Sequence, residues 1–326
     1  MAKTAKVLCF RINDEKDLVH VFWCFSQGYF FRGHADAQWR LQTTLERKYS
    51  EYHQESLRTG IQEHRIAKDV EKYFSNAFSK DLTLSGEYNA IQKYRCLSSP
   101  PISMEKLKNV EVLAKMQHYG AATRLLDVTT SFLIALFFAF EGHNDKDRAV
   151  WVFNRNYFYR NSGLIQPRTN FDTEAEKERI FSELIKNDDD LCKNSINYAD
   201  EFIYNPQKET DDKKTLIPLE ITGNNPRLIA QNGAFLFPSI LNKSFEENLC
   251  SVLNMGMEDF SAACNKIQRK RIRNENNLTL INAAVIKLVF PVNIRHLAER
   301  LFQAANISYQ SIYPDEIGIA KSIKYW

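Results

Sequence analysis

The 326-residue chain is poor in the features that identify several common protein classes. Its six cysteines are scattered and none lies at C-x-x-C spacing, which predicts reduced thiols rather than a disulfide framework or a zinc site. The longest apolar run, residues 132–140, is too short to cross a bilayer. The first residues lack the basic region and apolar run of a signal peptide. We therefore expect a cytoplasmic protein without a membrane partner.

Several well-known catalytic motifs are missing as well. The chain contains no glycine-rich phosphate loop of the P-loop or Rossmann type, no H-E-x-x-H pair and no G-x-S-x-G turn. Its histidines lie without the spacing of metal ligands, so no metal site is expected. The composition is typical of a soluble globular protein, with 44% hydrophobic and 25% charged residues. The net charge of +3 does not by itself imply a nucleic-acid partner.

Residues 115–140 form the most informative segment. Polar side chains of catalytic type crowd into its first half, and an almost wholly apolar helix is expected over residues 132–141. A buried charge costs several kcal/mol unless it is paired. The segment therefore either holds a structural ion pair or lines a site.

Two interpretations of this segment remain open. In the functional one, Asp127 orients Arg124 or a ligand hydroxyl at a cleft. In the structural one, Arg124 pairs with Asp127 across one turn, and Thr130 or Ser131 caps the following helix. The side chains expected to line the cleft are His118, Tyr119, Thr123 and Arg124.

Two shorter patterns also allow either a functional or a structural role. In Phe31-Arg32-Gly33, a strand delivers Arg at its end and then turns on Gly. That geometry suits a phosphate or pyrophosphate, although Arg32 could instead pair with a structural carboxylate. Gln231 lies in an apolar run just before a Gly turn, so it is either a structural bracket or a ligand contact.

Residues 266–273 are strongly basic, since five of the eight side chains are cationic. A solvated helix face and a surface that contacts nucleic-acid phosphates both fit this pattern. The candidate phosphate contacts are Lys266, Arg269, Lys270, Arg271 and Arg273.

Periodicity and turn residues predict a mixed set of helices and strands. Helices are expected from residue 16 to about Gly28, and within residues 44–80, 105–119, 132–141 and 295–305. Strands are expected at 29–31, 149–153, 216–221, 234–237 and 281–290. A loop is expected at 85–105, an insertion at 168–215, and an insertion or separate helical subdomain at 240–280.

Taken in order, the motifs resemble the FRG domain family, which is named for the motif seen here at Phe31, Arg32 and Gly33. The resemblance continues through Gln117-His118-Tyr119-Gly120, Thr123 to Asp127, and Arg227 to Phe235, and it ends with Ser311 to Ala320. It implies one elaborated domain over residues 1–326. Its core blocks are 29–48, 115–153, 216–238 and 281–321, and its probable insertions are 168–215 and 240–280.

The order of elements also looks like that of the ADP-ribosyltransferase fold. This likeness implies an α+β protein in which a split mixed sheet is surrounded by helices, with NAD as the substrate. Arg32 and Gly33 would hold the pyrophosphate or ribose, Thr129 to Ser131 would support the nicotinamide ribose, Tyr119 would stack on nicotinamide, and His118 would bind a ribose hydroxyl. Thr123 and Arg124 would complete the NAD-binding set. The candidate catalytic residues are Gln231, Asp127 and Glu316.

The resemblance implies an NAD-dependent ADP-ribosyltransferase that acts as a bacterial toxin or phage-defence effector. Its acceptor would be a nucleic acid, with RNA favoured, or a protein, and an antitoxin or inhibitor could hold it in check. Two alternatives remain open. One is a nucleotide or nucleic-acid sensor without turnover, and the other is a metal-dependent nuclease with Asp127, Asp315 and Glu316 as ligands.

Overall fold

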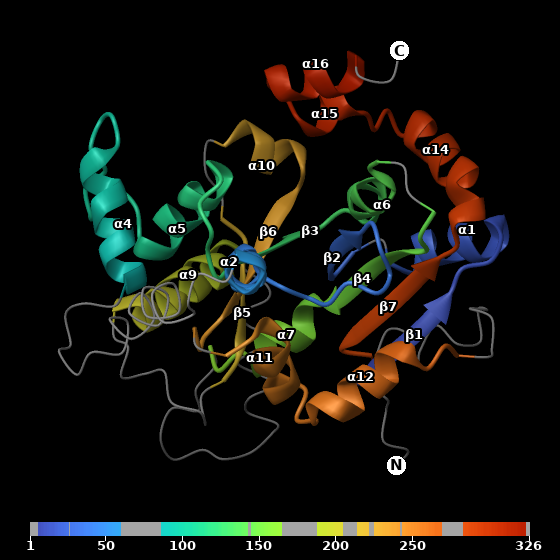
Figure 1. Ribbon diagram of the computed structural model, residues 1–326, viewed down its shortest axis with the longest axis horizontal. Coiled ribbons are helices and arrows are strands. Elements are labelled where there is room, and N and C mark those ends of the chain that lie inside the picture. Colours follow the sequence, from blue (N-terminus) through green and yellow to red (C-terminus); the bar gives the residue numbers. More distant parts are fainter. Residues whose placement is uncertain are drawn as a thin grey trace.

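The computed structural model describes residues 6–25, 27–59, 86–142, 145–164, 188–204, 214–221, 225–241, 243–268 and 283–323. Seven strands form one mixed sheet in the order β1-β7-β4-β2-β3-β6-β5, and helices surround it (Figure 1). The protein is therefore α+β, as expected. The strands are β1 (Val7–Arg11), β2 (Tyr29–His34), β3 (Leu126–Thr129), β4 (Arg148–Asn154), β5 (Leu216–Leu219), β6 (Gly233–Pro238) and β7 (Val285–Phe290).

The sheet is weakly joined at its centre. Strand β2 pairs with β4 along six residues but meets β3 at the single register pair Phe31 and Thr129. The neighbouring pairs are antiparallel except for β1 and β7, which are parallel. The sheet thus consists of two halves, β1-β7-β4-β2 and β3-β6-β5, which diverge beyond one shared pair.

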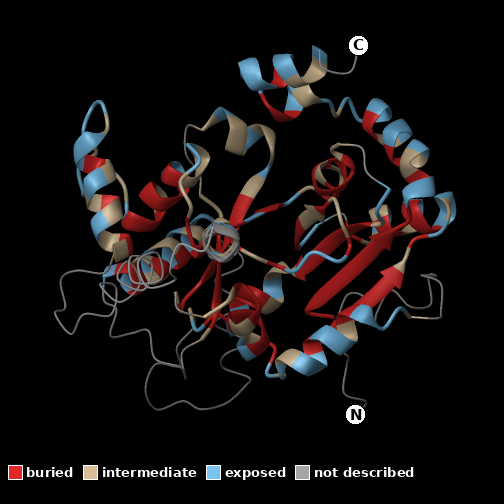
Figure 2. Cartoon of the chain, in the orientation of Figure 1, coloured by how far each residue is buried: buried red, intermediate tan, exposed pale blue. Residues whose placement is uncertain are grey.

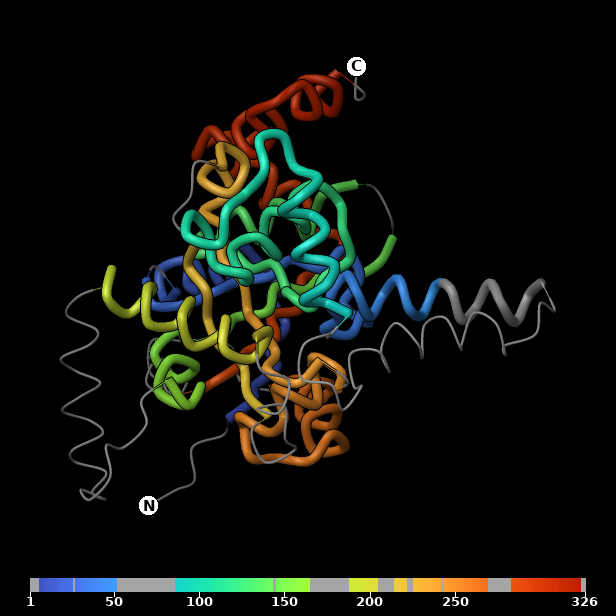
Figure 3. Tube along the Cα trace, turned by 90° about the vertical axis from the view of Figure 1, so that its left-hand side faces the viewer, coloured from blue at the N-terminus to red at the C-terminus, as the bar shows by residue number. Residues whose placement is uncertain are grey.

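Helices pack on both faces of the sheet. The α-helices are α1 (Glu15–Cys24), α2 (Thr44–Thr59), α4 (Gly86–Leu97), α5 (Asn109–His118), α6 (Phe132–Phe140), α7 (Arg155–Asn161), α9 (Asp188–Tyr204), α10 (Pro226–Ala230), α11 (Phe245–Val252), α12 (Met257–Asn265), α14 (Arg295–Ala304), α15 (Tyr309–Ile312) and α16 (Glu316–Ile323). A short 3₁₀ helix, η4 (Val292–Ile294), precedes α14. The pair α15 and α16 lies at one end of the molecule beside α10 (Figures 1 and 3).

Helix α6 explains two residues of the sequence motifs. Ser131 is its N-cap and accepts a hydrogen bond from the Ile134 amide, as one expectation proposed. A Cβ atom at Gly33 would lie 2.6 Å from the Ala139 amide nitrogen and closer still to the Ala135 carbonyl oxygen. Gly33 therefore lets α6 approach β2 closely. Its contribution is packing in a paired strand rather than a turn.

The strands are buried, and most helices bury only one face (Figure 2). One hydrophobic cluster joins α1, α6 and α14 to the sheet, a second joins α7, α11 and α12, and a third joins α4, α5 and α9. Phe245 of α11 and Phe260 of α12 share the second cluster with Phe30 and Trp151 of the sheet. The expectation of a separate helical subdomain at 240–280 is therefore wrong for the described part of that range.

Two other expectations about the elements are wrong, and two concern segments that lie largely outside the described residues. The loop expected at 85–105 contains helix α4, and strand β1 was not expected. Residues 60–80 of the helical region expected at 44–80 lie outside the described residues. The same holds for the insertion expected at 168–215, apart from α9 and residues 214–215. None of the six cysteines forms a disulfide. Within the described ranges no helix is both long and apolar enough to cross a membrane.

Candidate functional site

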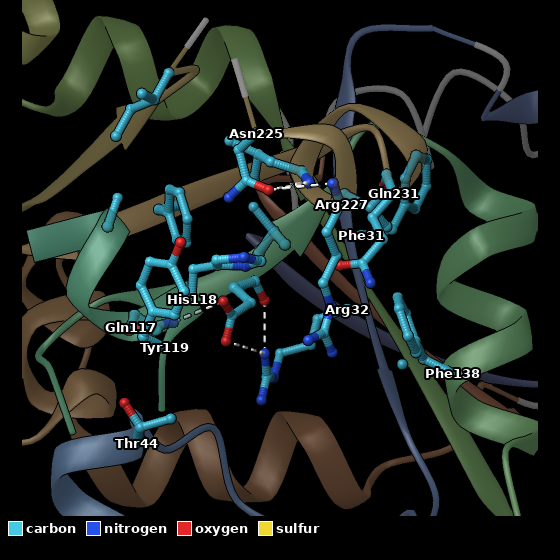
Figure 4. Close-up of a pocket in the computed structure, with 18 of the residues that line it drawn as sticks. Phe31, Arg32, Thr44, Gln117, His118, Tyr119, Phe138, Asn225, Arg227 and Gln231 are labelled. Carbon is cyan, nitrogen blue, oxygen red and sulfur yellow. Dashed lines mark hydrogen bonds and ion pairs between the residues drawn. The ribbon is translucent and has the colours of Figure 1, made fainter. Parts of the chain in front are cut away.

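A cleft of about 990 Å³ opens where the two halves of the sheet diverge (Figure 4). Phe31 and Thr129, the single register pair that joins the halves, both line it. Strands β2 and β3 form its floor, while α5, α10 and the C-terminal helices contribute walls. Its polar and aromatic lining includes Arg32, Trp39, Thr44, Lys115, Gln117, His118, Tyr119, Asp127, Thr129, Glu141, Asn225, Arg227, Gln231, Tyr309 and Lys321.

Arg32 is held firmly on the floor of the cleft. Its Nη1 donates to the Asp127 carbonyl oxygen at 2.6 Å and lies 3.9 Å from the Asp127 Oδ2 atom. The Nε atom lies 3.2 Å from the Nε2 atom of His34, and the Arg32 side chain is only 16% exposed. Burial lowers the pKa of Arg32 to about 10, although the Asp127 charge opposes that shift. The guanidinium therefore stays charged at neutral pH.

His34 supports Arg32 as a neutral base. Burial, followed by the charge of Arg32, lowers the pKa of His34 to about 3. The Trp151 Nε1 atom also approaches the ring, 3.3 Å from His34 Nδ1. Because a neutral imidazole accepts through only one nitrogen, the His34 tautomer decides whether it accepts from Arg32 or from Trp151.

A chain of polar contacts fixes Asp127. The Gln117 Nε2 atom donates to Asp127 Oδ1 at 2.6 Å, and the Thr123 hydroxyl donates to Gln117 Oε1. The Thr44 hydroxyl in turn donates to the Thr123 carbonyl oxygen at 3.1 Å. Asp127 is nevertheless 53% exposed. Helices α2 and α5 thus hold a carboxylate beside Arg32 while leaving it open to the cleft.

Helix α5 delivers His118 and Tyr119 to the cleft where it ends. The two rings meet edge to face with centroids 5.0 Å apart, and Tyr119 is 70% exposed. Burial, followed by the nearby charge of Arg227, lowers the pKa of His118, so this ring is also neutral at neutral pH. Trp39, 54% exposed, is a second accessible ring in the lining.

Arg124 does not line the cleft. Its guanidinium is buried and makes two hydrogen bonds to Glu87, at 3.0 and 2.6 Å. It also donates to the carbonyl oxygens of Pro238 and Ser239 and lies over the Phe237 ring. Arg124 therefore forms a structural ion pair, but its partner is Glu87 rather than Asp127.

Two other candidate residues are used inside the fold, and a third lies on the surface away from the cleft. Thr123 is buried and supports Gln117 from behind, and Ser131 caps α6. Glu316 is exposed in the first turn of α16 and does not line the cleft. Thus the structure brings together Arg32, Gly33, His118, Tyr119, Asp127, Thr129 and Gln231, and it leaves out Thr123, Arg124, Ser131 and Glu316.

Gln231 both connects two elements of the fold and lines the cleft. Its backbone carbonyl accepts from the Thr129 hydroxyl at 2.7 Å, while its Nε2 atom donates to the Ile312 carbonyl oxygen at 3.3 Å. It thereby ties β3 to helix α15. Of the basic residues, Lys266 is exposed just after α12, and Arg269, Lys270, Arg271 and Arg273 lie outside the described residues.

Sequence reasoning missed the walls of the cleft. Arg227 lines it with its guanidinium carbon 4.6 Å from the centre of the Tyr313 ring. Lys321 of α16 forms an ion pair with Glu141 at the end of α6. Arg227 belongs to one of the matching blocks, but no local pattern distinguishes it from a surface arginine. Lys321 and Glu141 are joined only by the tertiary fold.

The nuclease alternative has no ligand set in the described part of the chain. No group of three or more His, Cys, Asp or Glu side chains there is arranged to hold a metal ion. Asp315 caps the start of α16 through its side chain, away from the contacts of Asp127.

Residues 27–148 match the family model of the FRG domain. The chain contains an FRG domain. The matched residues include β2, α5, β3 and α6 of this structure and so provide Arg32, Gln117 and Asp127. The walls formed by α10, α15 and α16 lie outside the match. No curated protein and no solved structure matches the chain.

Proposed function

We propose that this FRG-domain protein is an NAD-dependent ADP-ribosyltransferase. One observation supports this function above the others: Arg32 and Asp127 lie side by side at the point where the sheet splits. A fixed guanidinium beside an accessible carboxylate suits a reaction that separates and transfers charge at a sugar carbon.

The cleft has the size and lining that a dinucleotide requires. Its volume of about 990 Å³ is at the upper end of the range for small-molecule sites. Exposed rings at Tyr119 and Trp39 offer stacking surfaces for a base or for nicotinamide. Gln231, Asn225 and His118 add polar groups for hydroxyls.

The proposed chemistry assigns different tasks to the two charged groups. The bond between the nicotinamide ring nitrogen and ribose C1′ breaks, and nicotinamide leaves with the electron pair. An acceptor then forms a bond to the oxocarbenium-like C1′ and loses its proton to Asp127. Arg32 holds Asp127 in place, because its guanidinium contacts the same residue twice. Gln231 orients a hydroxyl but cannot serve as a base.

The favoured acceptor is a nucleic acid, with RNA ahead of DNA, and a protein acceptor is the alternative. Single-stranded nucleic acid binds through bases stacked on exposed rings beside cations. Trp39, Tyr119 and Lys115 offer such a combination on the cleft. In a toxin or phage-defence role, an inhibitor partner would block this opening.

A second candidate function is nucleotide sensing without turnover. Both carboxylate oxygens of Asp127 already face partners, Gln117 at one and Arg32 at the other. A carboxylate engaged in this way can serve to orient a ligand without taking part in turnover. Binding of NAD without release of nicotinamide would support this second function.

The test is release of nicotinamide from NAD by the purified protein, alone, with total cellular RNA and with RNA-free lysate protein. Label transferred from NAD to RNA supports the favoured acceptor, and label on protein supports the alternative. Arg32→Ala should remove the release. Arg11→Ala is the matched control, because Arg11 pairs with Asp147 at the exposed edge of the sheet and does not line the cleft. Release of nicotinamide by Arg32→Ala at the wild-type rate would show that Arg32 is not part of the site.

A further inference from the structure

The cleft contains a cation that forms an ion pair with no carboxylate among the described residues. Arg32 faces Asp127, and Lys321 forms an ion pair with Glu141. Arg227 lines the same cleft, and within the described ranges no carboxylate lies within ion-pair distance of it. A half-buried guanidinium without a carboxylate partner is suited to an anionic ligand.

The position of Arg227 is fixed before any ligand arrives. The face of its guanidinium lies over the Tyr313 ring, 4.6 Å from the ring centre. The Tyr313 hydroxyl is held in turn by the Glu141 carboxylate at 3.3 Å. Stacking uses the face of a guanidinium and leaves its N–H donors free along the edge. The donors can therefore point into the cleft without a loss of side-chain freedom on binding.

Two neighbouring side chains can contact an anion together with Arg227. Lys115 of α5 lines the same cleft and adds positive charge, while Glu111 in the lining and Asp315 near His118 are acidic. His118 lies close enough for the charge of Arg227 to lower its pKa, so it offers a neutral ring nitrogen. Asn225, which caps α10, fixes the backbone from which Arg227 extends.

We propose that Arg227, stacked on Tyr313, is the phosphate-binding subsite of the cleft. The identity of the ligand, the pyrophosphate of NAD, rests on the function proposed above. Arg32, two of whose donor groups contact the Asp127 carbonyl and His34, then has the task of positioning Asp127. The C-terminal helices thereby become part of the binding site, although they lie outside the FRG match.

Calorimetric titration of the whole chain with ADP-ribose, inorganic pyrophosphate and adenosine tests this subsite. Arg227→Met should weaken binding of ADP-ribose and pyrophosphate roughly 10- to 100-fold, the range for a lost hydrogen bond to a charged group. The affinity for uncharged adenosine should change by less than about 2-fold, which is well below the loss expected for one such hydrogen bond. Arg227→Lys keeps the positive charge but lacks the planar guanidinium that stacks on Tyr313, so it should give an intermediate loss of affinity. Arg11→Met is the matched control for loss of an arginine elsewhere.

The subsite is overturned if Arg227→Met binds ADP-ribose as the wild type does, or if it loses adenosine and ADP-ribose equally. Absence of ADP-ribose binding by the wild type also overturns it. Failure of the proposed function looks different: ADP-ribose would bind through Arg227, yet NAD would never release nicotinamide. Conversely, Arg227→Met could release nicotinamide with an unchanged KM for NAD. That result would contradict the phosphate-binding role of Arg227 but not the transferase function.

Discussion

At the scale of single residues, each residue of the Phe31-Arg32-Gly33 motif has a separate structural role. Phe31 packs edge to face on Phe132 of α6, Arg32 holds Asp127, and Gly33 gives α6 room to approach. The sequence identified the motif and the charge on Arg32. It could not identify the role of Gly33, because the contact depends on a helix about one hundred residues further along the chain.

Gly33→Ala should destabilise the protein strongly. The added Cβ meets backbone atoms of α6, which cannot rotate away as a side chain would. Overpacking typically costs about 1–3 kcal/mol, and a clash with backbone belongs at the upper end. Urea unfolding measures the loss. Gly256→Ala is the control, since the nearest atom to its added Cβ is 3.5 Å away. Equal stability of the Gly33 and Gly256 variants would contradict the packing role.

Glu87→Gln should lower the free energy of unfolding more than an equivalent substitution at the surface. The substitution leaves the Arg124 guanidinium buried beside a neutral amide, and breaking a buried pair costs about 3–5 kcal/mol. Asp147→Asn breaks the exposed pair with Arg11 and should cost no more than about 1 kcal/mol. Comparison of the free energies of unfolding decides the point. Similar losses in the two variants would mean that Arg124 finds other compensation.

His34 makes stability depend on pH. Its pKa is about 3 in the folded protein against an ordinary 6.5, so the unfolded chain takes up a proton first as the pH falls. Stability therefore decreases from pH 6.5 downward, by up to about 1.4 kcal/mol per pH unit. His34→Asn removes this contribution, and its free energy of unfolding should change less between pH 6.5 and about 5. Parallel profiles for the variant and the wild type would contradict a neutral His34.

At the scale of elements, continuous apolar runs were a reliable guide and mixed signals were not. The apolar run of α6, its Ser131 cap and the buried strand β4 were all predicted. Helix α4 was mistaken for a loop because Gly86 and the prolines near residue 100 suggested turns, whereas Gly86 in fact begins the helix. Strand β1, a short segment of five residues, was not predicted, although four of the five are buried.

Gly318→Ala should loosen one element without unfolding the whole. Its Cβ would lie 2.8 Å from the Tyr309 carbonyl oxygen and closer still to that of Tyr313, so α16 could not dock on α15. We expect faster hydrogen exchange over residues 309–323 and weaker ADP-ribose binding, with a smaller loss of global stability than for Gly33→Ala. Ile319→Ala, on an exposed position of the same helix, is the control. Unchanged exchange would show that the close approach is not needed.

At the scale of the whole molecule, the cleft forms because the two halves of the sheet diverge and separate segments close around the gap. Residues 27–148 supply its floor, and the chain beyond residue 225 supplies Arg227 and the C-terminal wall. The sequence predicted the first group through its motifs. The second depends on long-range contacts such as Lys321 with Glu141, which no local pattern contains.

The most direct test of the transferase is Asp127→Asn, which keeps the shape of the side chain and removes its ability to take a proton. NAD binding, measured by calorimetry, should stay within a few-fold of wild type, because the variant can still accept from Gln117. Nicotinamide release in the presence of acceptor should fall by about 10²-fold or more, as expected for loss of a general base. Release at the wild-type rate by Asp127→Asn would contradict the account.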